Sequence, residues 1–382
     1  MDIYYKYGIH VVDKDIHILC DPTSTISSED EKEKIKESKV LSAYKSVTHV
    51  FISHGHNDHI DLLSYIDKKT PIYTHPFTYQ FKIKNFNGKE NINFIKEKET
   101  MNILDNLKIE CYPSGHCGGS LMFLIHMNGK KILFTGDINS ENTLSTMKPK
   151  PIKCDILLIE STFGSPDYVL KPRDEIYERL LNHISKKMEN NNNLIIYGHG
   201  LGKLQDIIAL LNKNGYKRLY TDMYSSRICN IYDQYYKKLG KYNIITDSIV
   251  LKDKSILCIS MHLGYNKENI NKLIHEFGLS PNTPILYTTG WGNKEKIEEE
   301  NEENSVEKTE VEKNFEEILN QFKDVEFFPL SSHSGYENLL YYIDSCDPDY
   351  IGLFHGFPEA FSKKLKEFGL NGYNLVKEKI KI

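Results

Sequence analysis

The sequence contains no apolar run of the length that crosses a membrane, so no membrane-spanning helix is expected. Residues 1–6 lack the basic and then apolar pattern of a signal peptide, so we expect a cytoplasmic location. The seven cysteines form no CxxC pair and show no regular spacing. Neither a disulfide framework nor a thiolate zinc cluster is therefore expected, and most of the cysteines are interpreted as small core residues.

The chain has no excess of basic residues, since its formal net charge is −5 at pH 7. Residues 294–317 hold eleven acidic residues and four lysines, a local charge of −7, so the rest of the chain carries +2. This acidic stretch has few apolar residues and is expected to be a solvated loop or an exposed helix. The net charge therefore does not exclude a nucleic-acid partner.

What the chain does have is a change of pattern near residue 164. Short apolar runs of strand length dominate before it, and residues 9–12 and 16–20 predict a hairpin. After it, helical patterns at 174–190 and 203–213 alternate with short apolar runs, as in a parallel sheet. Those runs lie at 194–198, 217–221, 255–260 and 284–289.

The pattern of the first part returns near the C-terminus, with apolar runs at 325–330 and 350–354 on either side of a helical pattern. This return predicts that a second domain is inserted into the first. We predict a first domain over 1–164, an inserted α/β domain over 165–323 and a completing part of the first domain over 324–382.

A run of six residues after the predicted strand 47–53 gathers four groups that bind metals. His54 and His56 leave the strand end on the same side, and Asp58 and His59 project from the next turn. Imidazole and carboxylate are ligands that suit zinc, so the run can supply two adjacent metal pockets. The alternative interpretation is a polar surface turn.

Two further metal ligands are expected beside glycines, where the backbone can approach closely. His116 lies in the sequence PSGHCGGS, and Asp137 ends the sequence FTGD. A carboxylate at the position of Asp137 can bridge two cations, with a hydroxide as the second bridge and the nucleophile. Read alone, His116 could be a structural turn residue and Asp137 a helix cap.

The order of Asp21, HGHNDH, GHCGGS and TGD resembles the metallo-β-lactamase superfamily. The resemblance implies an α/β fold in which an αββα sandwich carries metals at the edges of its sheets. It also implies one zinc ion held by His54, His56, His116 and Asp137, and a second held by Asp58, His59, Asp137 and a later histidine. Because such folds host many hydrolases, these residues do not define the substrate.

The second half of the chain resembles the β-CASP nucleases of this superfamily, the group that includes RNase J and the cleavage and polyadenylation factor type. Glu160 lies in IESTFG, like motif A, His333 in FPLSSHSGY, like motif B, and His355 in LFHG, like motif C. The resemblance implies that His355 completes the second zinc site and that His333, oriented by Glu160, protonates the leaving oxygen.

An imidazole held by a carboxylate suits this acid role, because its pKa stays near neutrality while it presents one fixed N–H. Each residue also has a simpler interpretation. His333 could cap a helix, His355 could bond to a loop, and Glu160 could pair with a lysine.

These observations predict a phosphodiesterase with two Zn²⁺ ions, in which Asp58, Glu160 and His333 are catalytic. The expected substrate is single-stranded nucleic acid, RNA in preference to DNA, gripped by lysines such as Lys203. The alternatives are a DNA exonuclease of the Artemis-like repair branch, a small-molecule hydrolase of the same fold, and an RNA-binding protein without activity. The presence of every expected ligand disfavours the last of these. A homodimer is expected from the family resemblance alone.

Overall fold

The computed structural model describes the chain except for residues 25–35, 87–89, 191–192, 237–238, 247–250, 252–253, 262–271, 273 and 291–324. The acidic stretch 294–317 therefore lies outside the described residues, as does the predicted domain boundary at 323. The described chain divides into two compact units. Unit 1 contains Met1–Ser140, Met147–Leu170 and His333–Ile382, and unit 2 contains Glu141–Thr146 and Lys171–Ser332.

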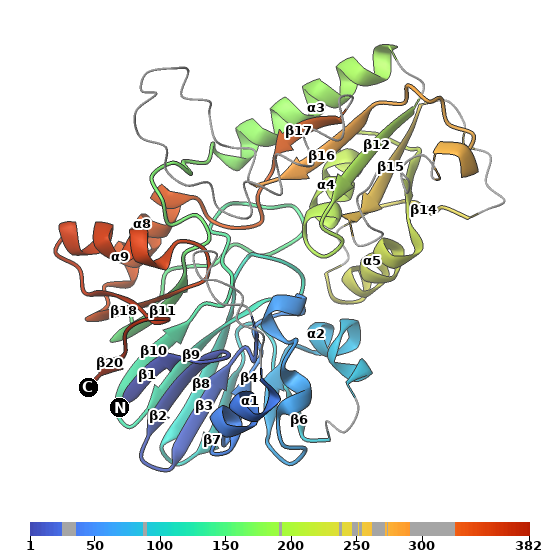
Figure 1. Cartoon of the computed structure of the whole chain (residues 1–382). Helices are drawn as coiled ribbons and strands as arrows, with labels where there is room; N and C mark the ends of the chain where they lie inside the picture. Colours follow the sequence, from blue (N-terminus) through green and yellow to red (C-terminus); the bar gives the residue numbers. More distant parts are fainter. Residues whose placement is uncertain are drawn as a thin grey trace. The chain divides into compact units, whose positions relative to one another are not determined.

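Unit 1 is built on two seven-stranded sheets (Figure 1). The first sheet has the order β20-β1-β2-β3-β4-β5-β6, in which the strands from β3 to β6 run parallel. Its strands are β1 (Asp2–Tyr5), β2 (Ile9–Asp13), β3 (Ile16–Cys20), β4 (His49–Phe51), β5 (Ile72–Thr74), β6 (Ile92–Phe94) and β20 (Ile380–Lys381).

The second sheet has the order β19-β18-β11-β10-β9-β8-β7. It is antiparallel from β7 to β10 and parallel from β10 to β19. Its strands are β7 (Thr100–Leu104), β8 (Leu107–Pro113), β9 (Leu121–Met127), β10 (Lys130–Phe134), β11 (Ile156–Glu160), β18 (Tyr350–Phe354) and β19 (Gly372–Asn374).

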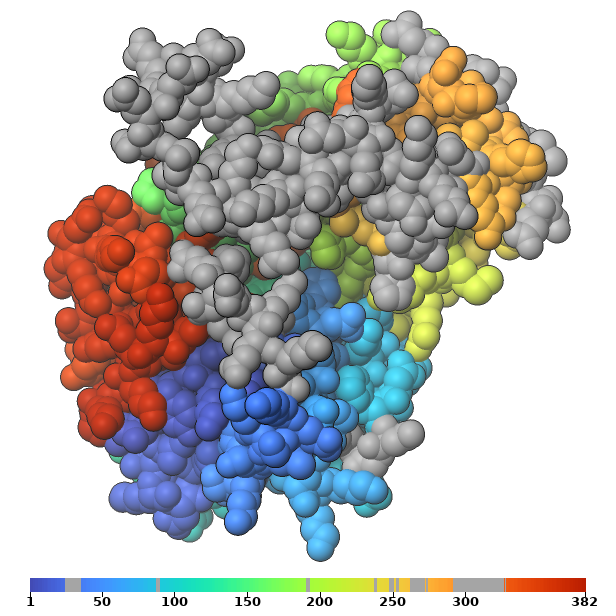
Figure 2. All heavy atoms as spheres, in the orientation of Figure 1, coloured from blue at the N-terminus to red at the C-terminus, as the bar shows by residue number. Residues whose placement is uncertain are grey.

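The inner faces of the two sheets form one apolar core, because alternate side chains along each strand point to the same side. Phe51 of the first sheet stacks on Phe123 of the second with ring centroids 5.2 Å apart. The two ends of the chain meet in the first sheet, because β1 pairs with β20. Figure 2 shows the C-terminal segment against the first strands.

Helices cover the two outer faces of the sandwich. Those of the first sheet are α1 (Glu37–Tyr44) and α2 (Pro76–Phe81), with 3₁₀ turns η1 (Asn57–His59), η2 (Leu63–Tyr65) and η3 (Ile83–Asn85). Those of the second sheet are α8 (Tyr336–Cys346) and α9 (Pro358–Glu367). Unit 1 is therefore an αββα sandwich, as predicted. Among the described residues, no helix is both long and apolar enough to span a bilayer.

Unit 2 is an α/β structure around a parallel six-stranded sheet of order β14-β13-β15-β12-β16-β17. Its strands are β12 (Asn193–Gly198), β13 (Leu219–Thr221), β14 (Asn243–Ile244), β15 (Ser255–Ser260), β16 (Ile285–Thr289) and β17 (Val325–Pro329). Its helices include α3 (Arg173–Asn190), α4 (Lys203–Lys213) and α5 (Met223–Tyr235).

Two details differ from the sequence prediction. The run 325–330 forms β17, which pairs in parallel with β16 of unit 2, so the chain returns to unit 1 only at His333. Residues 165–170 lie with unit 1. The pattern of apolar residues cannot locate these crossings, because an edge strand buries the same residue types in either sheet.

A neutral histidine pair is buried near the first hairpin. His10 Nε2 lies 2.8 Å from the Lys6 carbonyl oxygen, which can only accept, so this nitrogen carries the proton. His10 Nδ1 then accepts from His17 Nε2 at 2.7 Å, and His17 Nδ1 lies 2.9 Å from Ser46 Oγ. Burial lowers the pKa of His10 to about 3.

We expect this pair to weaken the fold in acid. The folded pKa of His10 lies below the ordinary value of 6.5, so the stability that neutral His10 contributes is complete above pH 6.5 and is lost as the pH falls toward 3. The loss approaches about 1.4 kcal/mol per pH unit for this residue. Urea unfolding at several pH values should show that the stability gap between wild type and His10→Gln narrows in acid. A gap that stays constant with pH would contradict this account.

Candidate metal centre

The predicted site residues meet at one edge of the sandwich. Strands β3 and β4 run parallel, as do β10, β11 and β18, and β8 has the same direction as β10. The carboxyl ends of parallel strands share one edge of a sheet, so residues that follow them are brought together. These residues are Asp21 after β3; His54, His56, Asp58 and His59 after β4; His116 after β8; Asp137 after β10; Glu160 at the end of β11; and His355 after β18.

Three imidazoles converge in a first cluster. His56 Nδ1 lies 2.9 Å from His54 Nε2 and 3.0 Å from His116 Nε2. Asp137 Oδ2 lies 3.5 Å from His54 Nε2 and 3.6 Å from His116 Nε2. His54 and His116 are buried. The four side chains predicted as ligands of one metal are therefore within reach of one point.

A second cluster lies on the other side of Asp137. His59 Nε2 is 3.2 Å from Asp137 Oδ2, and His355 Nδ1 is 3.7 Å from Asp137 Oδ1. Asp58 Oδ2 lies 3.9 Å from His59 Nε2, and the side chain of Asp58 is half exposed. These are the residues predicted for a second metal, so Asp137 is common to both clusters.

The polar atoms at the junction of the clusters fit a cation. Among the described residues, His59 Nε2 and Asp137 Oδ1 are buried without a hydrogen-bond partner. A buried polar atom without a hydrogen-bond partner is costly, and a metal ion would satisfy both atoms. His59, Asp137 and His355 offer ligand atoms within 4.8 Å of one another, as do Asp21, His54 and His59.

The charge distribution also indicates that the site fits a cation. Burial lowers the pKa of His54 well below its ordinary value, so this imidazole is neutral, as a metal ligand must be. Burial would raise the pKa of Asp137, but His59 and His355 outweigh it and hold the pKa well below the ordinary range. Burial would also lower the pKa of His59, yet Asp137 and Asp58 hold it well above. The site therefore favours positive charge between these carboxylates.

Asp21 orients the second cluster without joining the predicted ligands. Its Oδ2 lies 2.7 Å from His59 Nδ1 and accepts from Ser53 Oγ at 2.5 Å, while its Oδ1 accepts from Ser53 N at 2.7 Å. This contact fixes the ring of His59 so that Nε2 faces Asp137. The sequence placed Asp21 in the motif order but assigned no role to Asp21 or Ser53.

Glycine makes the close approach of the two sheets possible at this edge. A Cβ on Gly136 would lie 2.4 Å from the Cβ of Ser53, and Gly136 has a φ of +53°. Any other residue would push Asp137 away from the histidine run. The FTGD motif therefore needs its glycine as much as its carboxylate.

His333 and Glu160 form a pair beside the first cluster. His333 Nδ1 lies 3.0 Å from both carboxylate oxygens of Glu160, and the ring centroids of His333 and His116 are 4.6 Å apart. Glu160 is buried and also accepts from Ile138 N at 2.7 Å and from the hydroxyl of Thr162. Because a carboxylate holds Nδ1, acid chemistry at His333 would use the other ring nitrogen, Nε2.

These contacts decide among the simpler interpretations. Helix α8 has Gly335 at its N-cap and no side-chain cap, so His333 does not cap it. Among the described residues, Glu160 bonds to Ile138 N, Thr162 and His333, and it pairs with no lysine. The side chain of His355 directs Nδ1 toward Asp137. The backbone of His355 has a φ of +55°, and its carbonyl oxygen accepts a hydrogen bond from the Ser161 hydroxyl at 2.5 Å.

Lys203 lies elsewhere, in unit 2, at the start of α4. It is buried and donates to the Thr288 carbonyl oxygen at 3.2 Å. Burial, followed by the nearby Arg173, lowers the pKa of Lys203 to about 7. The expectation that Lys203 grips a polyanion is wrong, because its ammonium group is enclosed by the protein.

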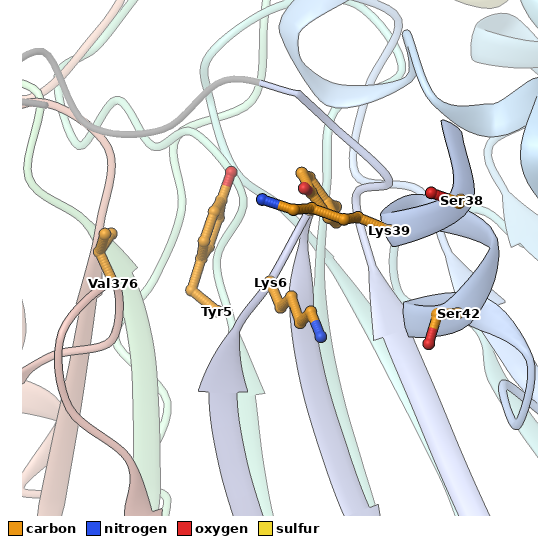
Figure 3. Close-up of a pocket in the computed structure, with 7 residues that line it drawn as sticks. Tyr5, Lys6, Ser38, Lys39, Ser42 and Val376 are labelled. Carbon is orange, nitrogen blue, oxygen red and sulfur yellow. The ribbon is translucent and has the colours of Figure 1, made fainter. Parts of the chain in front are cut away.

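Unit 1 contains a pocket of about 660 Å³ that offers lysines for binding a polyanion, the role that was expected of Lys203. Its lining includes Tyr5 at the end of β1, Lys6 and Tyr7 after it, and Lys39 on α1 (Figure 3). It contains no acidic residue among those described. Tyr5 also lines a small cavity that it shares with Asp21 and with His59 and His355 of the second cluster. Two ammonium groups can bind a phosphate, and a neighbouring tyrosine ring can stack on a base.

Comparisons with known proteins agree with this architecture. A family model described as a beta-lactamase superfamily domain matches residues 17–213. The crystal structure of a protein of unknown function from Enterococcus faecalis V583 superposes with a TM-score of 0.67 over 99% of each chain, at 14% sequence identity. At that identity the likeness concerns the fold alone.

Curated relatives include an RNase J-like protein of Methanocaldococcus jannaschii, 28% identical, with 82% of each chain covered. Endoribonuclease ysh-1 of Neurospora crassa is 27% identical over 52% of this chain and 21% of its own length. Cleavage and polyadenylation specificity factor subunit 3 of Dictyostelium discoideum is 27% identical over 43% of this chain and 24% of its own length. The chain thus spans most of the first relative but under a quarter of the other two.

The contacts of Asp21 lead to a test of metal binding. We expect Asp21→Asn to weaken zinc binding about 10- to 100-fold, the usual effect of losing a carboxylate that orients a histidine ligand. Competition with a chromophoric chelator measures the affinity. Asp67→Asn is the control, because Asp67 is an exposed carboxylate of unit 1 whose side chain accepts a hydrogen bond from the Lys69 backbone N–H. Equal affinities of wild type and Asp21→Asn would refute the orienting role.

Proposed function

The chain belongs to the β-lactamase superfamily, and on this basis we propose that it is a zinc-dependent nuclease that hydrolyses phosphodiester bonds of single-stranded RNA. Its resemblance to the β-CASP RNA-processing nucleases is confirmed by the ribonuclease relatives. The single observation that carries the proposal is the His333–Glu160 pair beside the histidine clusters. Lactam or thioester hydrolysis does not require such a pair.

The proposed metals are two zinc ions. His54, His56, His116 and Asp137 would hold one, and Asp58, His59, Asp137 and His355 the other. Zinc is favoured because most of these ligands are imidazoles, which suit zinc better than magnesium or calcium. Such cations would lower the pKa of a bound water to near 7 and would neutralise charge on the scissile phosphate.

His333 is the proposed general acid. Its Nδ1 is engaged by Glu160, so a proton on Nε2 can pass to the oxygen that leaves the phosphorus atom. Glu160 stabilises the protonated ring before the transfer, and Ile138 N and Thr162 hold the carboxylate in place. Because Ile138 follows Asp137 directly, one short segment positions both the acid and the carboxylate that would hold the metals.

RNA is favoured over DNA because the relatives that match this chain carry the names of ribonucleases and an RNA-processing factor. The pocket with Lys6 and Lys39 supports the proposal that a nucleic-acid strand binds there and runs toward the second cluster. A DNA exonuclease and a small-molecule hydrolase are the alternatives that the next experiments separate.

The direct test incubates the purified chain with 5′- and 3′-labelled single-stranded RNA and DNA of the same sequence. We expect cleavage of RNA in preference to DNA, loss of cleavage with a chelator, and recovery when zinc is added back. Asp137→Ala should remove activity because it takes a ligand from both metals. Cleavage that persists with chelator or in Asp137→Ala would sink the dinuclear model, and preferential cleavage of DNA would favour the repair-type alternative.

A second test isolates the acid. We expect His333→Ala to slow RNA cleavage by about two orders of magnitude or more, the usual contribution of a general acid. Replacing the leaving bridging oxygen of the substrate by sulfur should remove most of this defect, since a thiolate leaves without a proton. An equally large defect with the sulfur substrate would refute the acid role. If His333→Ala retains most of its activity on RNA, the small-molecule alternative gains support.

A further inference from the structure

The ring of His333, the proposed acid, stands close to the proposed metal ligands. One of its nitrogens lies within 4.8 Å of ligand atoms of His116 and Asp137, and its centroid is 6.1 Å from that of Phe163. Glu160 holds the ring at Nδ1, but this bond does not hold the backbone that carries the ring. A misplacement of about 1 Å can slow an enzyme about 100-fold, so the backbone of an acid at this place also needs a fixed position.

Ser334, the next residue along the chain, ties that backbone to the segment that follows Asp137. It is 1% exposed. Its backbone N–H donates to the Ile138 carbonyl oxygen at 2.8 Å. Its Oγ accepts from the backbone N–H of Ser140 at 2.9 Å and shares a further hydrogen bond with the Ser140 hydroxyl at 3.0 Å. The peptide after His333 is therefore held by both the main chain and the side chain of Ser334.

The hydroxyl of Ser334 does not serve the helix that begins beside it. Helix α8 has Gly335 at its N-cap and no side-chain cap. A serine at a helix start commonly bonds to the first N–H groups of that helix. Here the hydroxyl instead bonds to Ser140, which lies 194 residues earlier in the chain. Helix capping therefore does not account for this serine, whereas the long-range contact does.

The segment that receives these bonds, residues 138–140, is itself fixed at the candidate metal centre. Ile138 N donates to Glu160 at 2.7 Å, and Asn139 N donates to the Ser114 carbonyl oxygen, in the turn after β8, at 2.9 Å. The same three residues thus hold the carboxylate that orients the acid and the turn that carries a proposed ligand. A residue bound to this segment shares its position with both.

We propose that Ser334 is a positioning residue for His333, an inference that rests on the proposed function. Glu160 sets the direction of the imidazole, and the Ser334 hydroxyl sets the place of the backbone behind it. In this role Ser334 acts through His333 and has no contact with the reacting atoms. Without the hydroxyl, Ser140 N–H loses its acceptor, and the loop that carries the acid is released from residues 138–140 at this point.

Ser334→Ala and Ser362→Ala are a matched pair of variants. Each removes the hydroxyl of a buried serine of unit 1, and Ser362 donates to the Gly372 carbonyl oxygen at 2.9 Å. We expect Ser334→Ala to lower kcat for RNA by about 10- to 100-fold with little change in KM, because the acid is misplaced while the strand still binds. Ser362→Ala should keep the kcat of the wild type.

Two further measurements separate positioning from a general loss of structure. Sulfur in place of the leaving bridging oxygen should remove most of the Ser334→Ala defect, since a thiolate leaves without a proton. The double variant His333→Ala/Ser334→Ala should be no slower than His333→Ala, because no acid is left to position. Equal defects on both substrates, or defects that multiply in the double variant, would overturn the positioning role.

Amide hydrogen exchange of the full chain tests the contact without any nuclease assay. The Ser140 amide should be protected in the wild type and in Ser362→Ala, and it should exchange faster in Ser334→Ala. An unprotected Ser140 amide in the wild type refutes the inference, whatever the variants do. If the wild type cleaves RNA and Ser334→Ala does so with the same kcat, the positioning role alone fails. A wild type that cleaves no RNA refutes the proposed function, and the positioning role falls with it.

Discussion

The buried carboxylate of Asp137 is the constraint on which the site depends. It stays ionised at 3% exposure because imidazoles surround it, and its two oxygens face different clusters. A carboxylate in this position is costly without positive charge nearby, so it forms one electrostatic unit with the surrounding histidines. The remaining residues of the edge serve to bring that unit together.

The sandwich supplies this unit from both sheets. The first sheet provides the histidine run after β4 and Asp21 after β3, and the second sheet provides His116, Asp137 and His355. Gly136 and Ser53 come close enough at the edge that only glycine fits. The same apolar core that binds the sheets, with Phe51 stacked on Phe123, therefore also sets the separation of the two ligand groups.

The acid pair is tied to the same framework by the backbone. Glu160 lies at the end of β11, the parallel neighbour of the strand before Asp137, and it accepts from Ile138 N. Through this contact the position of His333 depends on the position of Asp137. A displacement of Asp137 would therefore disturb the proposed metal ligands and the proposed proton donor together.

The sequence by itself determined most of the elements and the chemistry of the candidate ligands, because periodicity and the spacing of HGHNDH, GH and TGD are local properties. Helix 203–213 and the strands 255–260 and 350–354 were predicted at their observed bounds. Only the tertiary structure decided that Asp21 orients His59, that Lys203 is enclosed and that β17 joins unit 2. Each of these depends on which segments, distant in the chain, meet at a strand end, and no local pattern of residues carries that information.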